Sequence, residues 1–172
     1  LNPLESRETV VDLTATDAER AEMLRRYRLF TRQPDEMITF MALQRMSPRK
    51  RDLDPQLYQY GGGYIYLIGA AIGLAHLTGL IDARAGVDHY LTHPEDFGHF
   101  YLVARIVVLV FGALLLVAVW KLARRAAGRL AGWIAFLLVA ASPVFISGVL
   151  EAKPHVPSAC MLAWAASLRA RR

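Results

Sequence analysis

The chain has 172 residues, of which 55% are hydrophobic, and a formal net charge of +5. Its single cysteine, Cys160, excludes an internal disulfide framework and a cysteine-based metal site. The surplus of positive charge sits in residues 121–129 and at the end of the chain, which is typical of membrane topology signals and argues against nucleic-acid binding.

The first predicted helix starts at Thr16. Thr16 and Glu19 fit a capping box, in which two side chains satisfy free backbone amides at a helix start. Four apolar residues fall on one side of the helix that follows, namely Met23, Leu24, Tyr27 and Phe30. Such a helix either lies on a membrane surface or packs on protein, and the pattern leaves both open.

An acidic pair follows the first proline of this region. Pro34 ends the preceding helix, and Asp35 and Glu36 stand where the next helix is expected to begin, before it ends ahead of Ser47. Carboxylates at a helix start can cap free amides and complement the helix dipole. They can also serve as a base or a metal ligand beside the membrane.

The next two stretches, residues 64–81 and 89–93, each allow two interpretations. Residues Tyr64 to Ile81 are apolar and long enough to cross a membrane, but they include several glycines and His76. Further on, His89 and His93 have the residue types and spacing of zinc ligands on a helix. Pro94 argues against a continuous helix there, so an interfacial loop is the other interpretation.

The most apolar part of the chain predicts a transmembrane hairpin. Tyr101 to Trp120 and Leu130 to Leu150 each hold about 20 residues, enough to cross a core of about 30 Å. The connection is basic, with Lys121, Arg124, Arg125 and Arg129. Short basic loops stay in the cytoplasm, so the outer ends, near Phe100 and Glu151, are expected outside. Another apolar segment starts at Val156.

Six features occur in an order that one group of enzymes shares. They are Asp35-Glu36, Tyr64 to Ile81, Ala104-Arg105, Ala123-Arg124-Arg125, Ser142-Pro143 and Glu151-Ala152-Lys153-Pro154. From about residue 33 to 168 the chain therefore resembles the N-terminal part of membrane glycosyltransferases of the C-type fold, in the protein O-mannosyltransferase and lipid A aminoarabinose transferase superfamily. It departs from that pattern because the 34 residues ahead of Asp35 are longer than expected and hold no transmembrane helix, and because Lys153 stands where arginine is frequent.

The resemblance implies an all-α polytopic membrane protein. Residues 1–100 would form an extracytoplasmic loop with amphipathic and juxtamembrane helices. Residues 101–172 would form the hairpin and the start of a further membrane helix, all within one larger membrane domain of which this chain is an N-terminal fragment. Asp35 and Glu151 lie on the same side of the membrane only if the chain crosses the membrane an even number of times between them. Residues 64–81 are then expected to lie along the membrane surface or dip into it.

The resemblance also implies the function and its residues. The enzyme would transfer a sugar, with inversion, from a polyprenyl-phosphate donor to a glycan, lipid or protein acceptor on the outer face of the membrane. The abundance of Ala and Arg suggests a bacterial source, so that this would be a bacterial inner membrane. Asp35 is expected to be the general base, with Glu36 orienting it or contacting the acceptor. The expected substrate-binding residues are Arg105, Glu151, Lys153 and His155. Arg105 and Lys153 would bind the leaving phosphate. No cofactor is required, although a divalent metal at Asp35 is possible.

Two other classes of protein fit part of the pattern. A polytopic transporter would use Arg105 and Glu151 as a charged gate within the membrane. A non-catalytic membrane scaffold would use Asp35 and Glu36 as a helix cap and residues 151–155 as a plain loop. These alternatives differ from the enzyme in what they do to a lipid-linked sugar.

Overall fold

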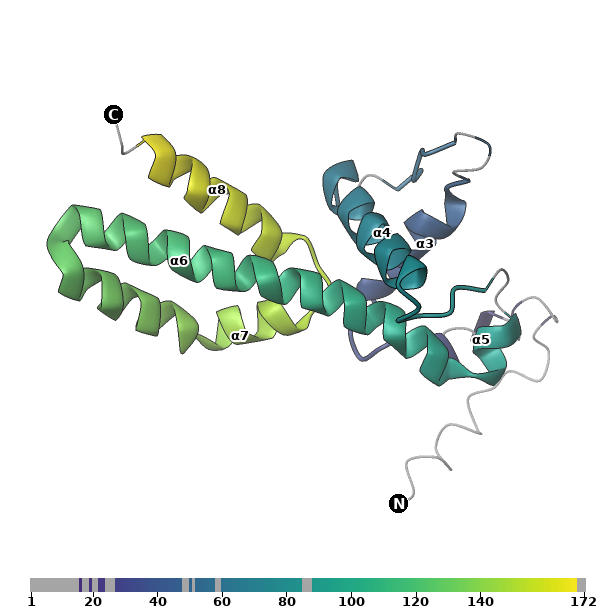
Figure 1. Cartoon of the computed structure of the whole chain (residues 1–172). Helices are drawn as coiled ribbons and strands as arrows, with labels where there is room; N and C mark the ends of the chain where they lie inside the picture. Colours follow the sequence, from purple (N-terminus) through teal and green to yellow (C-terminus); the bar gives the residue numbers. More distant parts are fainter. Residues whose placement is uncertain are drawn as a thin grey trace, which may run out of the picture.

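The structure is a computed structural model that describes residues 16, 19, 22–23, 27–47, 50, 52–57, 60–84 and 88–169. Its helices are α3 (Glu36–Arg45), α4 (Gly62–Leu77), α5 (Asp88–Thr92), α6 (Pro94–Ala140), α7 (Pro143–Leu150) and α8 (His155–Arg169). The expected all-α class is confirmed. Figure 1 shows a long hairpin with α8 beside it at one end, and a compact group formed by α3, α4 and α5 around the start of α6.

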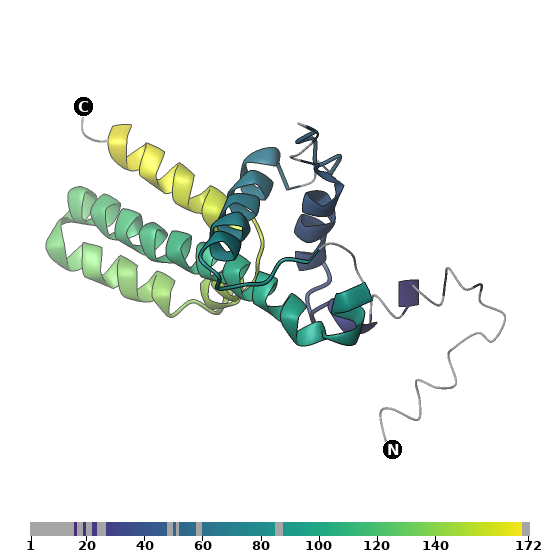
Figure 2. The same ribbon diagram turned by 45° about the vertical axis from the view of Figure 1, so that its right-hand side comes forward.

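The long helix α6 supplies both legs of the hairpin. Ala127 (φ −141°) and Gly128 (φ +89°) leave helical geometry, and the chain reverses there (Figures 1 and 2). A side chain rarely adopts such a positive φ, so glycine suits the reversal. By length and composition, α6 is the one helix of the described part that can cross a membrane, and 22% of its most apolar window is buried.

The legs of the hairpin differ in detail from the predicted spans. The first begins at Pro94 instead of Tyr101, because proline fits the first helical turn, where its missing N–H is not needed. The second is not one helix from Leu130 to Leu150. It stops at Ala140, and Pro143 starts α7 after an extended Ser142 (ψ 125°), because proline disfavours helical geometry in the residue before it.

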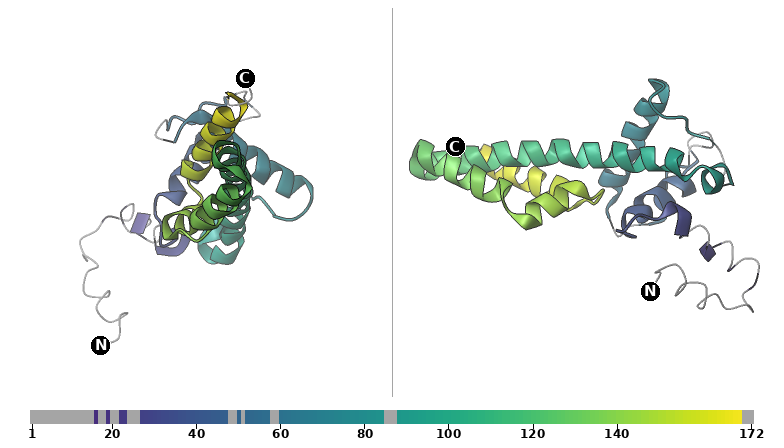
Figure 3. Two further views of the ribbon diagram at one scale, coloured as in Figure 1. Left: turned by 90° about the vertical axis from the view of Figure 1, so that its left-hand side faces the viewer. Right: turned by 90° about the horizontal axis from the view of Figure 1, so that it is seen from below.

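Helix α4 crosses α6 instead of running beside it (Figures 1 and 3). It has 16 residues, which corresponds to about 24 Å at 1.5 Å per residue, less than a hydrocarbon core of about 30 Å. The apolar stretch predicted over Tyr64 to Ile81 ends its helix at Leu77, where Gly79 (φ +74°) allows a turn. The length of α4 favours the expectation that this stretch lies along the membrane surface or dips into it, which stays a prediction.

An aromatic cluster fixes α3 and α5 on the start of α6. Phe40 packs edge to face against Phe97 and Tyr101, with ring centroids 5.7 and 4.8 Å apart. Tyr90 of α5 packs against Phe97 at 5.5 Å. The Tyr101 hydroxyl donates to the carbonyl oxygen of Leu29 at 2.9 Å, within the buried core. The start of α3 is thereby held against α6.

The predicted capping box is confirmed. The Thr16 backbone N–H and hydroxyl donate to Glu19 Oε2 at 2.7 and 2.9 Å. The Glu19 N–H donates to the Thr16 hydroxyl oxygen at 3.4 Å. Hydrogen bonds from the Thr16 backbone and side chain lower the pKa of Glu19.

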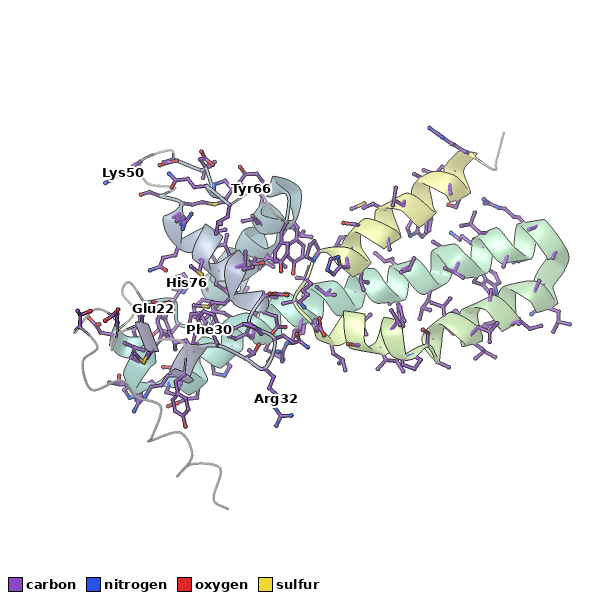
Figure 4. All side chains as sticks on the ribbon, turned by 180° about the vertical axis from the view of Figure 1, so that it is seen from behind. Glu22, Phe30, Arg32, Lys50, Tyr66 and His76 are labelled. Atoms are coloured by element: carbon purple, nitrogen blue, oxygen red, sulfur yellow. The ribbon has the colours of Figure 1, made fainter. Side chains whose placement is uncertain are left out.

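The apolar side predicted for this segment is only partly buried. Leu24 lies outside the described residues, and Met23 and Tyr27 are 40% and 65% exposed. Leu29 instead reaches the core, where it is 4% exposed. Figure 4 shows Phe30 close to the helices and Arg32 extending away from them.

Gly112 permits the close approach of α7 to α6. A Cβ atom at this position would lie 2.6 Å from Val149 Cγ1, inside van der Waals contact. We expect Gly112→Ala to lower the free energy of unfolding by about 1–3 kcal/mol, measured by denaturant unfolding in detergent. Gly98→Ala on the same helix is the matched control, because its Cβ would meet nothing within 4 Å. Equal stability of the two variants would contradict this packing.

Candidate functional site

Three segments that are distant in the sequence meet beside the first leg of α6. They are residues 31–36 at the start of α3, Arg105 on α6, and residues 151–153 between α7 and α8. Five of the predicted site residues are brought together there: Asp35, Glu36, Arg105, Glu151 and Lys153. The aromatic cluster and the return of α7 along α6 produce this convergence.

Glu36 is the buried centre of the site. Its side chain is 0% exposed, and Arg105 donates to both oxygens, from Nε at 3.0 Å and from Nη2 at 2.7 Å. The Thr31 hydroxyl donates to Oε2 at 2.6 Å, and the Ala152 N–H donates to Oε1 at 2.7 Å. Burial alone raises the pKa of Glu36, but these donors outweigh it and hold the pKa below the usual range.

Both oxygens of Glu36 are therefore occupied by partners from three segments. The Glu36 carboxylate ties α3 to α6 through Arg105 and to the segment after α7 through Ala152. No part of it is open to an acceptor molecule. A charged pair in this setting is costly to break, because the remaining partner loses its counter-ion. The expectation that Glu36 orients Asp35 or contacts the acceptor stays a prediction.

Asp35 is the open carboxylate of the pair. Its side chain is 56% exposed, and Oδ2 lies 3.3 Å from Lys153 Nζ. Asp35 occupies the residue before α3, yet its side chain makes no capping hydrogen bond. The capping interpretation therefore does not hold for Asp35, and its carboxylate faces the site.

Lys153 bridges the carboxylates of Asp35 and Glu151. Its Nζ lies 3.0 Å from Glu151 Oε2 as well as 3.3 Å from Asp35 Oδ2, and the side chain is only 14% exposed. Nζ also donates to Gln33 Oε1 at 3.5 Å. The hydrogen bond to Glu151, followed by the contact with Asp35, raises the pKa of Lys153 and keeps it protonated. The site thus holds a fixed cation between two carboxylates.

His155 lies farther out than the other predicted residues. It is the exposed first residue of α8, and its side chain makes no hydrogen bond or ion pair with the described residues. With Glu151 it lines an open groove of about 740 Å³ between α7 and α8. The rest of that groove is mostly apolar, with Pro143, Val144, Phe145, Gly148, Val156 and Ala159. An amphipathic molecule would fit such a groove, with its polar end toward the site.

Two tyrosines near the site, Tyr60 and Tyr64, were not predicted from the sequence as site residues. Partial burial and then the charge of Asp35 raise the pKa of the Tyr60 hydroxyl. Tyr64 is 8% exposed, and its hydroxyl has no hydrogen-bond partner among the described residues. Burial and then the charge of Glu36 raise its pKa. Their one signal in the sequence is their place at the start of the apolar stretch over α4.

The described residues show no cluster suited to a metal ion. No group of three or more His, Cys, Asp or Glu side chains converges in that part of the chain. Between Asp35 and Glu151 the ammonium group of Lys153 lies where a cation would be expected. The rings of His89 and His93 stack with centroids 4.8 Å apart, and His89 Nε2 lies 2.8 Å from Asp96 Oδ2. Metal dependence stays a prediction.

Comparison with known proteins bears on the second half of this site. Residues 97–171 match the model of the dolichyl-phosphate-mannose-protein mannosyltransferase family. The resemblance to mannosyltransferases is thereby confirmed over this segment. No curated protein and no solved structure matches the chain.

The mannosyltransferase match covers Arg105, Glu151 and Lys153, and it begins after Asp35 and Glu36. It supports a membrane glycosyltransferase of the mannosyltransferase type, which uses a lipid-linked sugar donor and an acceptor. The two acidic residues are connected to this matched segment by the hydrogen bonds and ion pairs of the site.

Proposed function

We propose that this chain forms part of the active site of a glycosyltransferase that moves a sugar from a polyprenyl-phosphate donor to an acceptor, on the extracytoplasmic side and with inversion. One observation carries the proposal. The exposed carboxylate of Asp35 faces a lysine from the mannosyltransferase-type segment, and a buried, fully hydrogen-bonded Glu36 fixes its position.

Asp35 is the general base of the proposed reaction. The acceptor's nucleophilic oxygen or nitrogen attacks the anomeric carbon of the donor sugar, and Asp35 takes the proton that the nucleophile loses. The bond between the anomeric carbon and the phosphate oxygen breaks, and its electron pair leaves with the polyprenyl phosphate. Attack opposite the leaving group inverts the anomeric configuration. The exposure of Asp35 supports this role, because a base must reach the acceptor.

Lys153 couples donor binding to the release of that base. In the unliganded site Lys153 is engaged with Glu151 and Asp35. A phosphate at Lys153 Nζ competes with these carboxylates for the same three N–H donors. When the donor phosphate takes one of them, Asp35 becomes available to the acceptor, while Glu151 keeps the ammonium in position. Negative charge that builds on the leaving phosphate is then met by a fixed cation.

Arg105 is the second cation of the site. Its guanidinium donates one hydrogen bond from Nε and one from Nη2 to Glu36, and the side chain is 39% exposed. A guanidinium has five N–H donors, so three remain for a phosphate without loss of the pair. The groove that starts at Glu151 and His155 suits the isoprenoid chain of the donor, because its remaining walls are mostly apolar.

The hairpin supports the proposed location of the site. Asp35 and Glu151 both contact Lys153, so they lie on the same side of the membrane. The basic reversal at residues 121–129 lies at the other end of the hairpin (Figure 1). Short basic connections stay in the cytoplasm, which supports the proposed extracytoplasmic location of the site, at a membrane such as the bacterial inner membrane.

The proposed function is tested by identifying the sugar donor and the anomeric configuration of the product. The full-length protein in membranes is given a panel of radiolabelled polyprenyl-phosphate sugars and, in parallel, the matching nucleotide sugars. We expect transfer from a lipid-linked donor alone, and NMR of the product should show an anomeric configuration opposite to that of the donor. Transfer from a nucleotide sugar, or retention of configuration, would contradict the proposal.

The role given to Lys153 predicts a split between binding and turnover. We expect Lys153→Gln to raise KM for the lipid donor by about 10- to 100-fold, because a hydrogen bond to a charged group contributes about 1.5–3 kcal/mol. Lys153→Arg is the matched control, since it keeps a cation and should remain within a few-fold of wild type. Steady-state kinetics over a range of donor concentrations decides this, and an unchanged KM in Lys153→Gln would remove Lys153 from the phosphate site.

A further inference from the structure

The reversal end of the hairpin carries an uncompensated cluster of positive charge. Its five members are Lys121, Arg124, Arg125, Arg129 and Arg169. The sequence has no acidic residue between Asp96 and Glu151 and none after Glu151, and none of the described ion pairs involves these five cations. Arg125 donates to the Ser167 carbonyl oxygen, which brings the end of α8 to the same place (Figure 1).

Two of these cations are held against aromatic rings. Lys121 Nζ lies 4.4 Å from the ring centroid of Trp164, and Arg124 Cζ lies 5.0 Å from that of Trp120. These contacts fix the cations and leave their N–H donors unused. Arg129 is exposed and has no such contact among the described residues. Donors suited to an anion are therefore gathered on both legs of the hairpin.

An apolar groove begins beside these arginines. It has a volume of about 310 Å³ and is lined by Val117, Trp120, Trp133 and Phe136. Trp120 lies one helical turn before Arg124, and Trp133 lies one turn after Arg129, so the groove runs from the cations toward the middle of the hairpin. The Trp120 indole N–H is buried without a hydrogen-bond partner among the described residues.

From this combination we infer that the reversal end of the hairpin binds an anionic phospholipid. Its phosphate lies between Arg124 and Arg129, and one acyl chain occupies the groove of Val117, Trp120, Trp133 and Phe136. Basic pockets between membrane helices recognise anionic headgroups by this chemistry. The site is at the opposite end of the hairpin from Asp35 and Lys153, and the inference does not depend on the proposed sugar transfer.

The test measures lipid binding directly. Native mass spectrometry of the full-length protein gives its affinities for phosphatidylglycerol and for phosphatidylcholine of the same chain length. We expect wild type to prefer phosphatidylglycerol, and the variant Arg124→Gln/Arg129→Gln to bind it about 30-fold more weakly, at about 1 kcal/mol per arginine. The variant Lys50→Gln/Arg84→Gln is the matched control, because it removes two exposed cations from the group around α3 and α4, and it should bind like wild type.

A headgroup without chains separates a lipid site from a simple anion site. Glycerophosphoglycerol is added as competitor, and we expect it to displace phosphatidylglycerol only at far higher concentration. Displacement at equal concentration would reduce the site to a phosphate-ester site and overturn the role of the groove. Equal affinity of wild type and Arg124→Gln/Arg129→Gln, both folded by thermal unfolding, would overturn the inference as a whole.

Discussion

Replacing Asp35 by asparagine is expected to lower kcat for sugar transfer by about 10²- to 10⁴-fold, the usual contribution of a general base. The amide has the same shape as the carboxylate but takes up no proton at neutral pH. Asp35 is exposed and has a single ion pair, so the free energy of unfolding should change by less than about 1 kcal/mol. Initial rates at saturating lipid donor, with unfolding measured on the same preparations, check both statements.

Asp82→Asn is the matched control for this experiment. Asp82 is also an exposed aspartate, and its partner, Arg84 at 2.8 Å, is itself exposed and outside the site. It should transfer sugar at the wild-type rate. Wild-type turnover by a folded Asp35→Asn protein would remove Asp35 from the mechanism.

Glu36→Gln is expected to act mainly on stability. The substitution leaves the guanidinium of Arg105 without its counter-ion, a change that typically costs about 3–5 kcal/mol for a buried pair. Because Arg105 is 39% exposed, water compensates part of this loss, and we expect a loss of about 3 kcal/mol. Denaturant unfolding in detergent measures it. Arg105→Met and the double variant complete a double-mutant cycle, in which the second substitution should cost much less than the first.

The pH dependence of the same variant gives a second readout. The pKa of Glu36 is lowered in the folded protein from an ordinary value of 4.5, so its charge stabilises the fold fully above about pH 4.5. This contribution is lost as the pH falls below 4.5 through the folded pKa. The difference in stability between wild type and Glu36→Gln should therefore be constant near neutral pH and shrink in acid. A difference that does not shrink would show that the ionised carboxylate is not its source.

The residues themselves did not predict that Glu36 is buried and Asp35 exposed, although the family resemblance assigned them different roles. Two adjacent carboxylates at a helix start are chemically alike, and either can be a cap, a base or half of an ion pair. What separates them is the helical phase of α3, which buries Glu36 with Met37 and Phe40 and leaves Asp35 outside. That phase depends on Arg105 and the aromatic cluster, which are far away in the sequence.

Other parts of the fold were visible in the sequence because local rules determine them. The capping box of Thr16 and Glu19, the helix after Pro34 and the reversal in the basic region depend on residues within a few positions of each other. The break before Pro143 follows from the same backbone rule, although hydropathy alone merged the two helices around it. Hydropathy counts apolar residues and does not register where the helix ends.

The tyrosines and Thr31 had no such local signal. Thr31 donates to Glu36 from five positions away, outside the helix that carries its partner. Tyr64 lies in a mostly apolar stretch, where an aromatic residue is expected as packing, and its buried hydroxyl stands out only in three dimensions. Contacts with Glu36 or Lys153 arise only when distant segments fold together, so no short sequence motif predicts them.

The transporter and scaffold alternatives predict different fates for a lipid-linked sugar. A transporter would move its substrate across the bilayer unchanged, through a gate of Arg105 and Glu151. In the structure Arg105 is paired with Glu36, and Glu151 with Lys153, so these two residues do not form a pair with each other. A scaffold would leave the donor untouched.

The most direct measurement uses proteoliposomes of the full-length protein, loaded with polyprenyl phosphate that carries a radiolabelled sugar, with acceptor supplied outside. Our account predicts that the label leaves the lipid and becomes covalently bound to the acceptor, at a rate that Asp35→Asn lowers by at least about 10²-fold. Label that crosses the bilayer or stays on the lipid, with none on the acceptor, would contradict it.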